Sequence, residues 1–288
     1  MPLIAIPGKY RLIGASPDGD SVRFYPNTPT AFADAGLTVK TNAAGGAQLR
    51  LDAIDALETH YTPPGAPHPW HQPAALGGGA ADALLELLGF SNVQRDARNI
   101  VTSSTPAETP GYILTRFADK YGRAVAFAYA GQRRGGTSKP VYVEVAELRR
   151  SVNYQLLADG WAYPTFYSKL FVELRNALAD AAVAARAAGK GVWEHDGTLA
   201  GFKLRSRAQL TDELVILPKL FRRLAEYLTL DEPTTVSLAG FKAFLQAGAD
   251  ELFTVPDGQA THLDTLIERK GQTLRLTVPP ERIIFQEG

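Results

Sequence analysis

The chain has 288 residues, and its 30 lysine and arginine residues are balanced by 30 aspartate and glutamate residues. A protein that binds nucleic acid over a broad surface is usually basic, so a phosphate-binding role here needs a local cluster of positive charge. The absence of cysteine excludes disulfides and thiolate metal sites, and no apolar run approaches the roughly 20 residues of a membrane span. No signal peptide is visible, which leaves the compartment open between the cytoplasm and export by another route.

The N-terminal part of the chain predicts short strands joined by tight turns. The strand-like stretches are residues 8–16, 21–26 and 47–53. Between the first two lies "PDGD" (17–20), which is a strong turn signal. Residues 62–79 are rich in proline and glycine and predict a loop, and a short helix is expected at about residues 80–88.

The rest of the chain predicts one hairpin, then mostly helices and finally strands. Residues 111–131 form two apolar arms around the turn "ADKYGR" (118–123). The basic loop at 131–140 contacts phosphate or is only solvated, and the pattern does not separate these two roles. Helices are expected at 151–160, 169–189, 211–228 with an interruption at Pro218, and 238–248, and a strand-rich end at 262–286.

These elements predict an α+β protein built on a five-stranded OB-fold β-barrel with packed helices. We expect the barrel domain to cover residues 1–199 and a small C-terminal α/β extension to cover residues 200–288. The extension is nearly neutral, so it is expected to be an accessory unit that could serve a protein partner. Its deletion is expected to leave the chemistry of the barrel domain in place.

Three separated pieces carry residue types that suit phosphodiester chemistry: "DGDSV" (18–22), "RLDAIDALET" (50–59) and "DKYGR" (119–123). Asp20 and Asp55 offer the hard oxygen ligands that Ca²⁺ or Mg²⁺ prefers. Arg50 and Arg123 have planar forks that can each hold two phosphate oxygens. Glu58 lies three residues after Asp55, where it could reach a metal-bound water.

In this order the three pieces resemble the staphylococcal nuclease (thermonuclease-like) family. The stretches "VNYQLLADGWAY" (152–163) and "AARAAGKGVW" (184–193) extend the resemblance to about residues 9–195. The resemblance implies a calcium-dependent nuclease that cuts DNA or RNA and leaves 5′-hydroxyl and 3′-phosphate ends. Two alternatives are a module of the same family that binds nucleic acid or protein without cutting, and a nuclease held inactive by its own C-terminal segment.

The resemblance also implies a role for each site residue. The catalytic residues would be Arg50, Glu58 and Arg123. The Ca²⁺ ligands would be Asp20, Asp55, the backbone carbonyl of Ala56, and Glu58 directly or through a water. The substrate-binding residues would be Lys120 and Tyr121 at a neighbouring phosphate, and Tyr163, Phe166 and Tyr167 near the positions of base-stacking tyrosines.

Three positions near the site depart from the family pattern. Leu57 stands where proline is common before the glutamate, which predicts a looser turn at Glu58. Ala56 replaces a side-chain hydroxyl but keeps its carbonyl. Asp52 occupies a usually apolar position, where it would either orient Arg50 or partly neutralise it.

Overall fold

The computed structural model describes residues 2–133, 140–230, 236–248 and 250–286. The chain forms two compact units, Met1–Asp52 with Ala80–Leu156 and Ala53–Gly79 with Leu157–Gly288. Both α2 (Ala74–Leu87) and α4 (Val152–Ala158) contain a point where the chain passes from one unit to the other. The expected boundary after residue 199 divides the chain differently and stays a prediction. Most of the basic loop at 131–140 lies outside the described residues.

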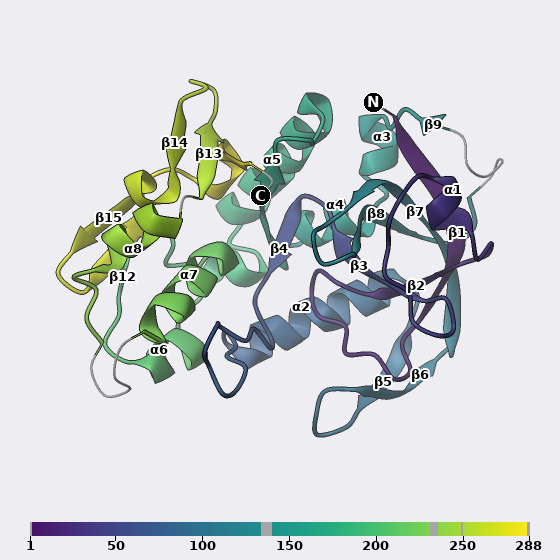
Figure 1. The fold of residues 1–288 in the computed structure, drawn as a ribbon, viewed down its shortest axis with the longest axis horizontal. Coiled ribbons are helices and arrows are strands. Elements are labelled where there is room, and N and C mark those ends of the chain that lie inside the picture. Colours follow the sequence, from purple (N-terminus) through teal and green to yellow (C-terminus); the bar gives the residue numbers. More distant parts are fainter. Residues whose placement is uncertain (1, 134–139, 231–235, 249, 287–288) are drawn as a thin grey trace. The chain divides into compact units, whose positions relative to one another are not determined.

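Five strands of the first unit are linked by their pairings in a closed circuit, and Figure 1 labels all five. Its members are β1 (Leu3–Arg11), β2 (Arg23–Pro26), β3 (Ala47–Leu51), β7 (Glu108–Ala118) and β8 (Ala124–Ala130). In the described part of the unit, β1 pairs with β2 and β7, β3 pairs with β2 and β8, and β7 pairs with β8. Only the pairing of β3 with β8 is parallel among these five. The mixed α+β class is thus confirmed, whereas the OB-fold barrel stays a prediction.

Further short elements belong to the first unit. They are α1 (Ala31–Asp34), β5 (Ser91–Arg95), β6 (Val101–Thr105), β9 (Pro140–Val141) and α3 (Val145–Leu148). The strands β5 and β6 pair with each other, and β9 pairs with β1. The predicted hairpin at 111–131 is confirmed as β7 and β8, and Gly122 takes a φ of +84° at the turn.

In the core of the first unit, the side chain of Tyr10 packs directly against the backbone of β7. Tyr10 is fully buried, and its hydroxyl lies 3.2 Å from the carbonyl oxygens of Tyr112 and Tyr129. A Cβ atom at Gly111 would lie 2.2 Å from the Tyr10 ring. The glycine is therefore required here because β7 passes directly against an aromatic face.

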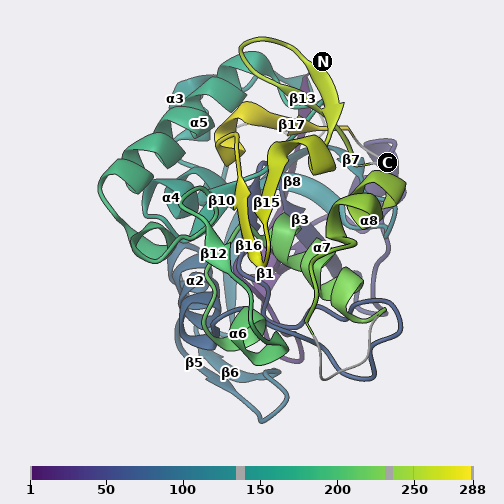
Figure 2. The ribbon, with the colours of Figure 1, turned by 90° about the vertical axis from the view of Figure 1, so that its left-hand side faces the viewer.

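The second unit contains many short strands. They are β4 (Ile54–Ala56), β10 (Ala162–Pro164), β11 (Phe166–Tyr167), β12 (Phe202–Lys203), β13 (Glu251–Thr254), β14 (Ala260–His262), β15 (Ile267–Lys270), β16 (Thr273–Leu276) and β17 (Ile283–Phe285). They form three sheets in the described residues: β4 with β10, β11-β17-β13-β14, and β12-β16-β15. Figure 2 shows β12, β16 and β15 side by side.

The helices of the second unit are α5 (Val172–Ala187), α6 (Arg207–Asp212), α7 (Pro218–Leu228) and α8 (Phe241–Gly248), with 3-10 turns η1 (Gly191–Glu194), η2 (Leu263–Leu266) and η3 (Pro280–Arg282). Three of these helices lie within predicted stretches, but residues 213–217 of the predicted helix 211–228 are not helical, and α6 begins before that stretch. Gly160 and Gly189 follow α4 and α5 with φ of +77° and +62°, as expected for C-terminal glycines. Pro218 begins α7, because its missing N–H costs nothing in the first turn. No helix in the described ranges has both the length and the apolar composition needed to cross a membrane.

The helix predicted at about residues 80–88 begins earlier, so the end of the predicted loop 62–79 is helical. In the structure α2 begins at Ala74 and includes the three glycines of "GGG". A Cβ atom at Gly79 would lie 2.7 Å from the Trp161 ring. Tertiary packing against this ring therefore compensates the poor helix propensity of glycine.

One apolar cluster fills the second unit. It includes Leu57, Tyr163 and Trp193 from the part before residue 199, and Phe221 and Leu274 from the part after it. Residues on both sides of the predicted boundary thus share a core. An ion pair between Arg186 of α5 and Glu281 of η3, with Nη1 and Oε2 2.7 Å apart, joins the same two parts.

Candidate functional site

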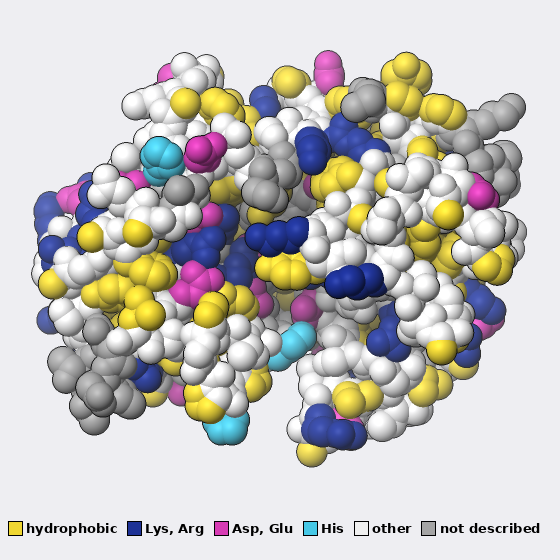
Figure 3. Space-filling model, in the orientation of Figure 1, with side chains coloured by type: hydrophobic (Ala, Val, Ile, Leu, Met, Phe, Trp, Pro, Cys, Tyr) yellow, Lys and Arg dark blue, Asp and Glu magenta, His cyan; other side chains and the backbone are white. Residues whose placement is uncertain are grey.

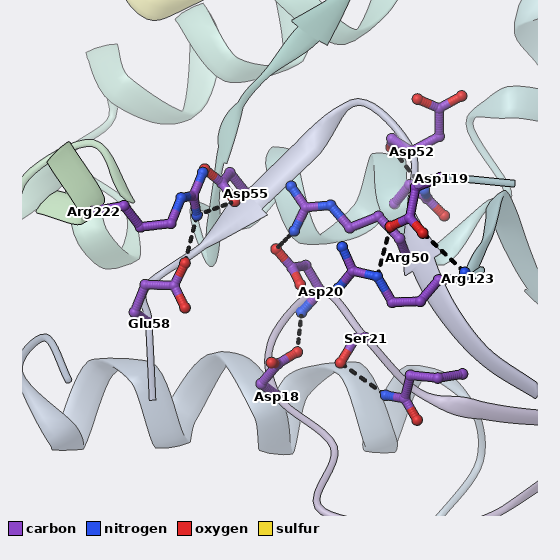
Figure 4. A network of polar contacts seen from close by, with 12 residues as sticks. Asp18, Asp20, Ser21, Arg50, Asp52, Asp55, Glu58, Asp119, Arg123 and Arg222 are labelled. Atoms are coloured by element: carbon purple, nitrogen blue, oxygen red, sulfur yellow. Dashed lines mark hydrogen bonds and ion pairs between the residues drawn. The ribbon is translucent and has the colours of Figure 1, made fainter. Parts of the chain in front are cut away.

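The predicted turn at 17–20 presents Asp20 to Arg50 in the first unit. Asp18 accepts a hydrogen bond from the Asp20 N–H at 3.2 Å, so Asp18 shapes the turn. The N–H of Leu51 donates to the Asp20 carbonyl at 2.8 Å, which fastens the turn to the end of β3. The carboxylate of Asp20, which is almost buried, forms an ion pair with the Arg50 guanidinium (Figure 4). Asp20 therefore orients a predicted phosphate-binding arginine.

The second predicted phosphate-binding arginine stands on the turn of the hairpin. Asp119 accepts from the backbone N–H groups of Tyr121 and Arg123 at 3.0 and 2.9 Å. It also accepts from Arg123 Nε at 2.7 Å, and the Arg123 side chain is 33% exposed. Tyr121 is 62% exposed, and the Lys120 ammonium lies 5.7 Å from its ring centroid. These residues offer cations and one aromatic face to solvent, which suits a phosphate chain.

Asp52 sits where β3 ends, and its backbone is well anchored. Its N–H donates to the Ala126 carbonyl at 2.9 Å, and its carbonyl accepts from Asn153 Nδ2 at 2.8 Å. The expected choice between orienting and neutralising Arg50 is not decided by these backbone bonds.

In the second unit, β4 carries Asp55 and Ala56 opposite β10. Asp55 lies across from Tyr163 and Ala56 across from Ala162. The Asp55 side chain has no exposed surface, in contrast to an ordinary solvated carboxylate. A buried carboxylate needs a cation or several hydrogen-bond donors, because desolvation disfavours its charge.

The turn that carries Glu58 is held firmly although it lacks the proline of the family. Leu57 is buried in the apolar cluster. The N–H of Glu58 donates to Gln72 Oε1 at 3.2 Å, and the Glu58 carbonyl accepts from the Gln72 N–H at 2.7 Å. Gln72 is itself buried and donates from Nε2 to the Ile216 carbonyl at 2.8 Å. The burial of Leu57 and the hydrogen bonds of Gln72 anchor this turn, and the expectation that it is looser than a turn with proline stays a prediction.

Arg222 of α7 provides the cation for both carboxylates. Its Nη1 and Nη2 donate to Asp55 Oδ1 and Oδ2 at 3.1 and 2.8 Å, and Nη1 also donates to Glu58 Oε1 (Figure 4). Burial alone would lower the pKa of Arg222, but the charges of Asp55 and Glu58 raise it well above its usual value. The guanidinium is therefore permanently charged.

The sequence analysis did not single out Arg222. The only signal was a pair of arginines in an amphipathic helix, "LFRRLAEYL" (220–228), which is typical of a solvated face. Where Figure 1 places α7, Figure 3 shows lysine and arginine side chains beside aspartate and glutamate. On this helix, Lys219 and Arg223 both form ion pairs with Asp250.

The predicted calcium ligands do not fit a metal ion in this arrangement. Ca²⁺ takes six to eight oxygen ligands, including carboxylates with free lone pairs. Both oxygens of Asp55 and one of Glu58 accept hydrogen bonds from Arg222 instead. Asp20 is paired with Arg50. Among the described residues, no group of three or more His, Cys, Asp or Glu side chains is placed to hold a metal ion.

The three aromatic residues proposed to stack on bases lie in packed surroundings. Tyr163 and Phe166 have no exposed surface. The Tyr163 hydroxyl donates to Asp196 at 2.8 Å, and its ring packs against Trp193 at 4.8 Å between centroids. Tyr167 is partly buried and contacts Phe285. Stacking by Tyr163 and Phe166 needs an open ring face, and burial removes it, so this structure does not support that role.

Arginines that a carboxylate already orients, such as Arg50 and Arg123, can form bidentate hydrogen bonds with a phosphate group. The model of the staphylococcal nuclease homologue family matches residues 48–195, just over half of the chain. The chain belongs to this family. Asp20 lies before the matched range and Arg222 lies after it. No curated protein matches the chain.

Proposed function

We propose that the chain is a nuclease that hydrolyses phosphodiester bonds of DNA or RNA. The observation that carries the proposal is the pair of arginines, Arg50 and Arg123, each oriented by its own carboxylate. A guanidinium that is already oriented loses little freedom when it binds a phosphate. The family match is consistent with this substrate class.

The proposal assigns distinct tasks to three residues. Arg50 and Arg123 hold the phosphate oxygens and stabilise the negative charge that develops at phosphorus as water attacks. Glu58 orients the attacking water or removes its proton. As the family resemblance implies, the products would carry 5′-hydroxyl and 3′-phosphate ends.

Lys120 and Tyr121 complete the proposed substrate contacts at a neighbouring phosphate. Their exposure at the hairpin turn supports this role, because a long anionic chain can reach them. Calcium dependence is the finer part of the family analogy. We derive no catalytic step through calcium, because its expected ligands Asp55 and Glu58 are engaged by Arg222.

A second candidate function is binding of nucleic acid without cutting. The ion pairs of Asp55 and Glu58 with Arg222 favour it, because these carboxylates then have a structural role that explains their presence without catalysis. Both candidates predict that Arg123 contributes to nucleic-acid affinity. They differ only in what Glu58 does.

The test is Glu58→Gln, which keeps the size of the side chain and removes its charge and basicity. Cutting of single-stranded DNA, measured with EDTA and with millimolar Ca²⁺, should fall by about 10²–10⁴-fold, the usual range for general acid–base catalysis. Binding of the same DNA, measured by fluorescence anisotropy, should change little. Asp82→Asn, an exposed carboxylate of α2, is the control and should cut at the wild-type rate.

Two outcomes would contradict the proposal. If Glu58→Gln cuts as fast as the wild type, Glu58 is neither base nor water orienter. If the wild type binds DNA in every buffer and cuts it in none, the chain is a binding module.

A further inference from the structure

A single guanidinium contacts Asp55 and Glu58, two of the three carboxylates that the nuclease analogy assigns to calcium. Arg222 donates to both oxygens of Asp55 and to one oxygen of Glu58, so three of these four oxygens accept from one side chain. We propose that Arg222 is a built-in cation that takes the place of a divalent metal ion at Asp55 and Glu58. The inference rests on the proposed function for the choice of these carboxylates, but its test measures metal binding rather than cutting.

Because the site is buried, Arg222 and a divalent ion cannot both contact Asp55. The Asp55 side chain is fully buried, and the side chains of Arg222 and Glu58 are each 20% exposed. A divalent ion could reach Asp55 only if the guanidinium left its forked contact. The departing guanidinium would then lose its partners while remaining attached to a packed helix, and a charge left unpaired in such a place is strongly unfavourable.

The helix that carries Arg222 is anchored in the core of the second unit. Leu220, Phe221 and Leu224 of α7 are fully buried in the same apolar cluster as Leu57. Leu57 lies between Asp55 and Glu58 in the chain. The helix and the acidic segment are therefore held together by the core on which they both pack, independently of the ion pairs.

Hydrogen bonds hold the segment after Glu58 to the region around α7 at three further points. Tyr61 donates to Glu226, Thr229 Oγ1 donates to the Pro64 carbonyl at 3.3 Å, and Gln72 Nε2 donates to the Ile216 carbonyl at 2.8 Å. These contacts fix the distance between the Arg222 backbone and the two carboxylates. The contact of Arg222 with Asp55 and Glu58 is thus fixed by the fold of the second unit and does not depend on the long side chains alone.

The neighbouring cations of α7 have other partners. Lys219 lies 3.0 Å from Asp250, and Arg223 binds Asp250 and Glu226. Burial alone would raise the pKa of Asp250, but the hydrogen bonds from Arg223 and the charge of Lys219 lower it to about 2. Each basic residue of the helix is therefore matched to particular acids, and Arg222 is matched to Asp55 and Glu58.

The proposal has a direct consequence for cofactor use. Glu58 and Asp55 together carry two negative charges, and Arg222 supplies one positive charge that cannot be lost as a proton at any physiological pH. Chemistry at Glu58 would then proceed with a fixed guanidinium in place of an exchangeable ion. Any cutting by the wild type is expected to be insensitive to EDTA.

The experiment is a Ca²⁺ titration of the full chain by isothermal titration calorimetry, in the wild type and in Arg222→Ala. The wild type should show no binding at Asp55 up to about 10 mM Ca²⁺, above the 10⁻⁴–10⁻³ M range of weak carboxylate sites. The variant Arg222→Ala should bind Ca²⁺ at Asp55 with an affinity at least tenfold higher than that of the wild type. The thermal midpoint of that variant should rise with Ca²⁺, because the ion binds the folded state. Arg222→Gln, which fills more of the space and also lacks the charge, provides a second variant should the alanine variant not fold.

Two controls locate the effect. Arg275→Ala removes an exposed arginine that pairs with the partly exposed Glu268, so it should leave Ca²⁺ binding as in the wild type. Adding Asp55→Asn to Arg222→Ala should abolish the gained site. The proposal is overturned if the wild type binds Ca²⁺ as tightly as the Arg222 variants and loses that binding in Asp55→Asn. It is also overturned if folded Arg222 variants gain no binding. A wild type that never cuts DNA would count against the proposed function and leave this test intact.

Discussion

The two units use arginine and carboxylate groups in contrasting ways. In the first unit, Arg123 is one third exposed and is oriented by one carboxylate, that of Asp119. In the second unit, Arg222 is held by two carboxylates, one of them without exposed surface. An exposed pair adds at most about 1 kcal/mol to stability, whereas breaking a buried pair by removing one partner costs about 3–5 kcal/mol. Identical residue types thus form a partly solvated ion pair in one place and a largely buried cluster in the other.

The contrast also bears on how an acidic motif is interpreted. Asp20 and Asp55 are equally good metal ligands by residue type, and the motif alone does not distinguish them. In the structure the partner of Asp20 is Arg50, thirty residues away, whereas the partner of Asp55 is Arg222, 167 residues away. A carboxylate therefore cannot be assigned to a metal before its cationic neighbours are known.

The largest effect is expected from removing residues 200–288. This deletion takes away most of the apolar cluster that covers Leu57, Tyr163 and Trp193, together with the partner of Asp55. We expect the 1–199 fragment to aggregate or to lack a cooperative thermal transition, measured by size-exclusion chromatography and circular dichroism. A soluble fragment with a cooperative transition would instead establish residues 200–288 as the separable accessory unit that the sequence analysis predicts.

The second-largest effect is a difference in unfolding free energy between variants that break a buried ion pair and a partly exposed one. Arg222→Ala should lower the free energy of unfolding by about 3–5 kcal/mol, because it leaves Asp55 buried without its cation. Arg123→Ala should lower it by less than about 1 kcal/mol, because its pair with Asp119 is partly solvated. Urea denaturation at pH 7 measures both. Equal losses in the two variants would contradict the distinction.

An intermediate effect concerns pH. The pKa of Asp250 in the folded protein is about 2, below its usual value, because Arg223 and Lys219 outweigh the effect of burial. The resulting stabilisation is present above the unfolded pKa of about 4 and is lost as the pH falls from about 4 towards 2. The difference in unfolding free energy between wild type and Asp250→Asn should therefore shrink by about 2 kcal/mol between pH 5 and pH 2.

The smallest effect is expected on binding rather than on folding. Arg123→Ala should weaken the affinity for single-stranded DNA by about tenfold, the value of one charge-assisted hydrogen bond. The slope of affinity against salt should also become shallower, since one phosphate contact is lost. Fluorescence anisotropy at two or more salt concentrations measures both quantities. Arg275→Ala, far along the chain in the strand β16, is the matched control, and an equal loss there would show that only net charge matters.

Much of the local structure could be predicted from the sequence because it depends on short-range effects. The hairpin around Gly122, the helix ends before Gly160 and Gly189, and the role of Asp18 in its turn all follow from backbone preferences of single residues. The match to residues 48–195 confirms the family and covers the motifs at 50–59 and 119–123, whereas the motif at 18–22 lies before the matched range. Residue type and the family resemblance marked Arg50 and Arg123 as candidates for phosphate binding, and this role stays a prediction.

Only the tertiary structure determined which residues pair with these side chains. The pairing of Asp55 and Glu58 with Arg222 joins positions more than 160 residues apart, and no local pattern marks such a contact. Gly79 of α2 packs against the Trp161 ring, and Gln72 anchors the backbone at Glu58. Periodicity in the sequence predicts which face of an element is buried. Which charges meet on that face is decided when the chain packs, because burial removes the solvent that would otherwise screen them.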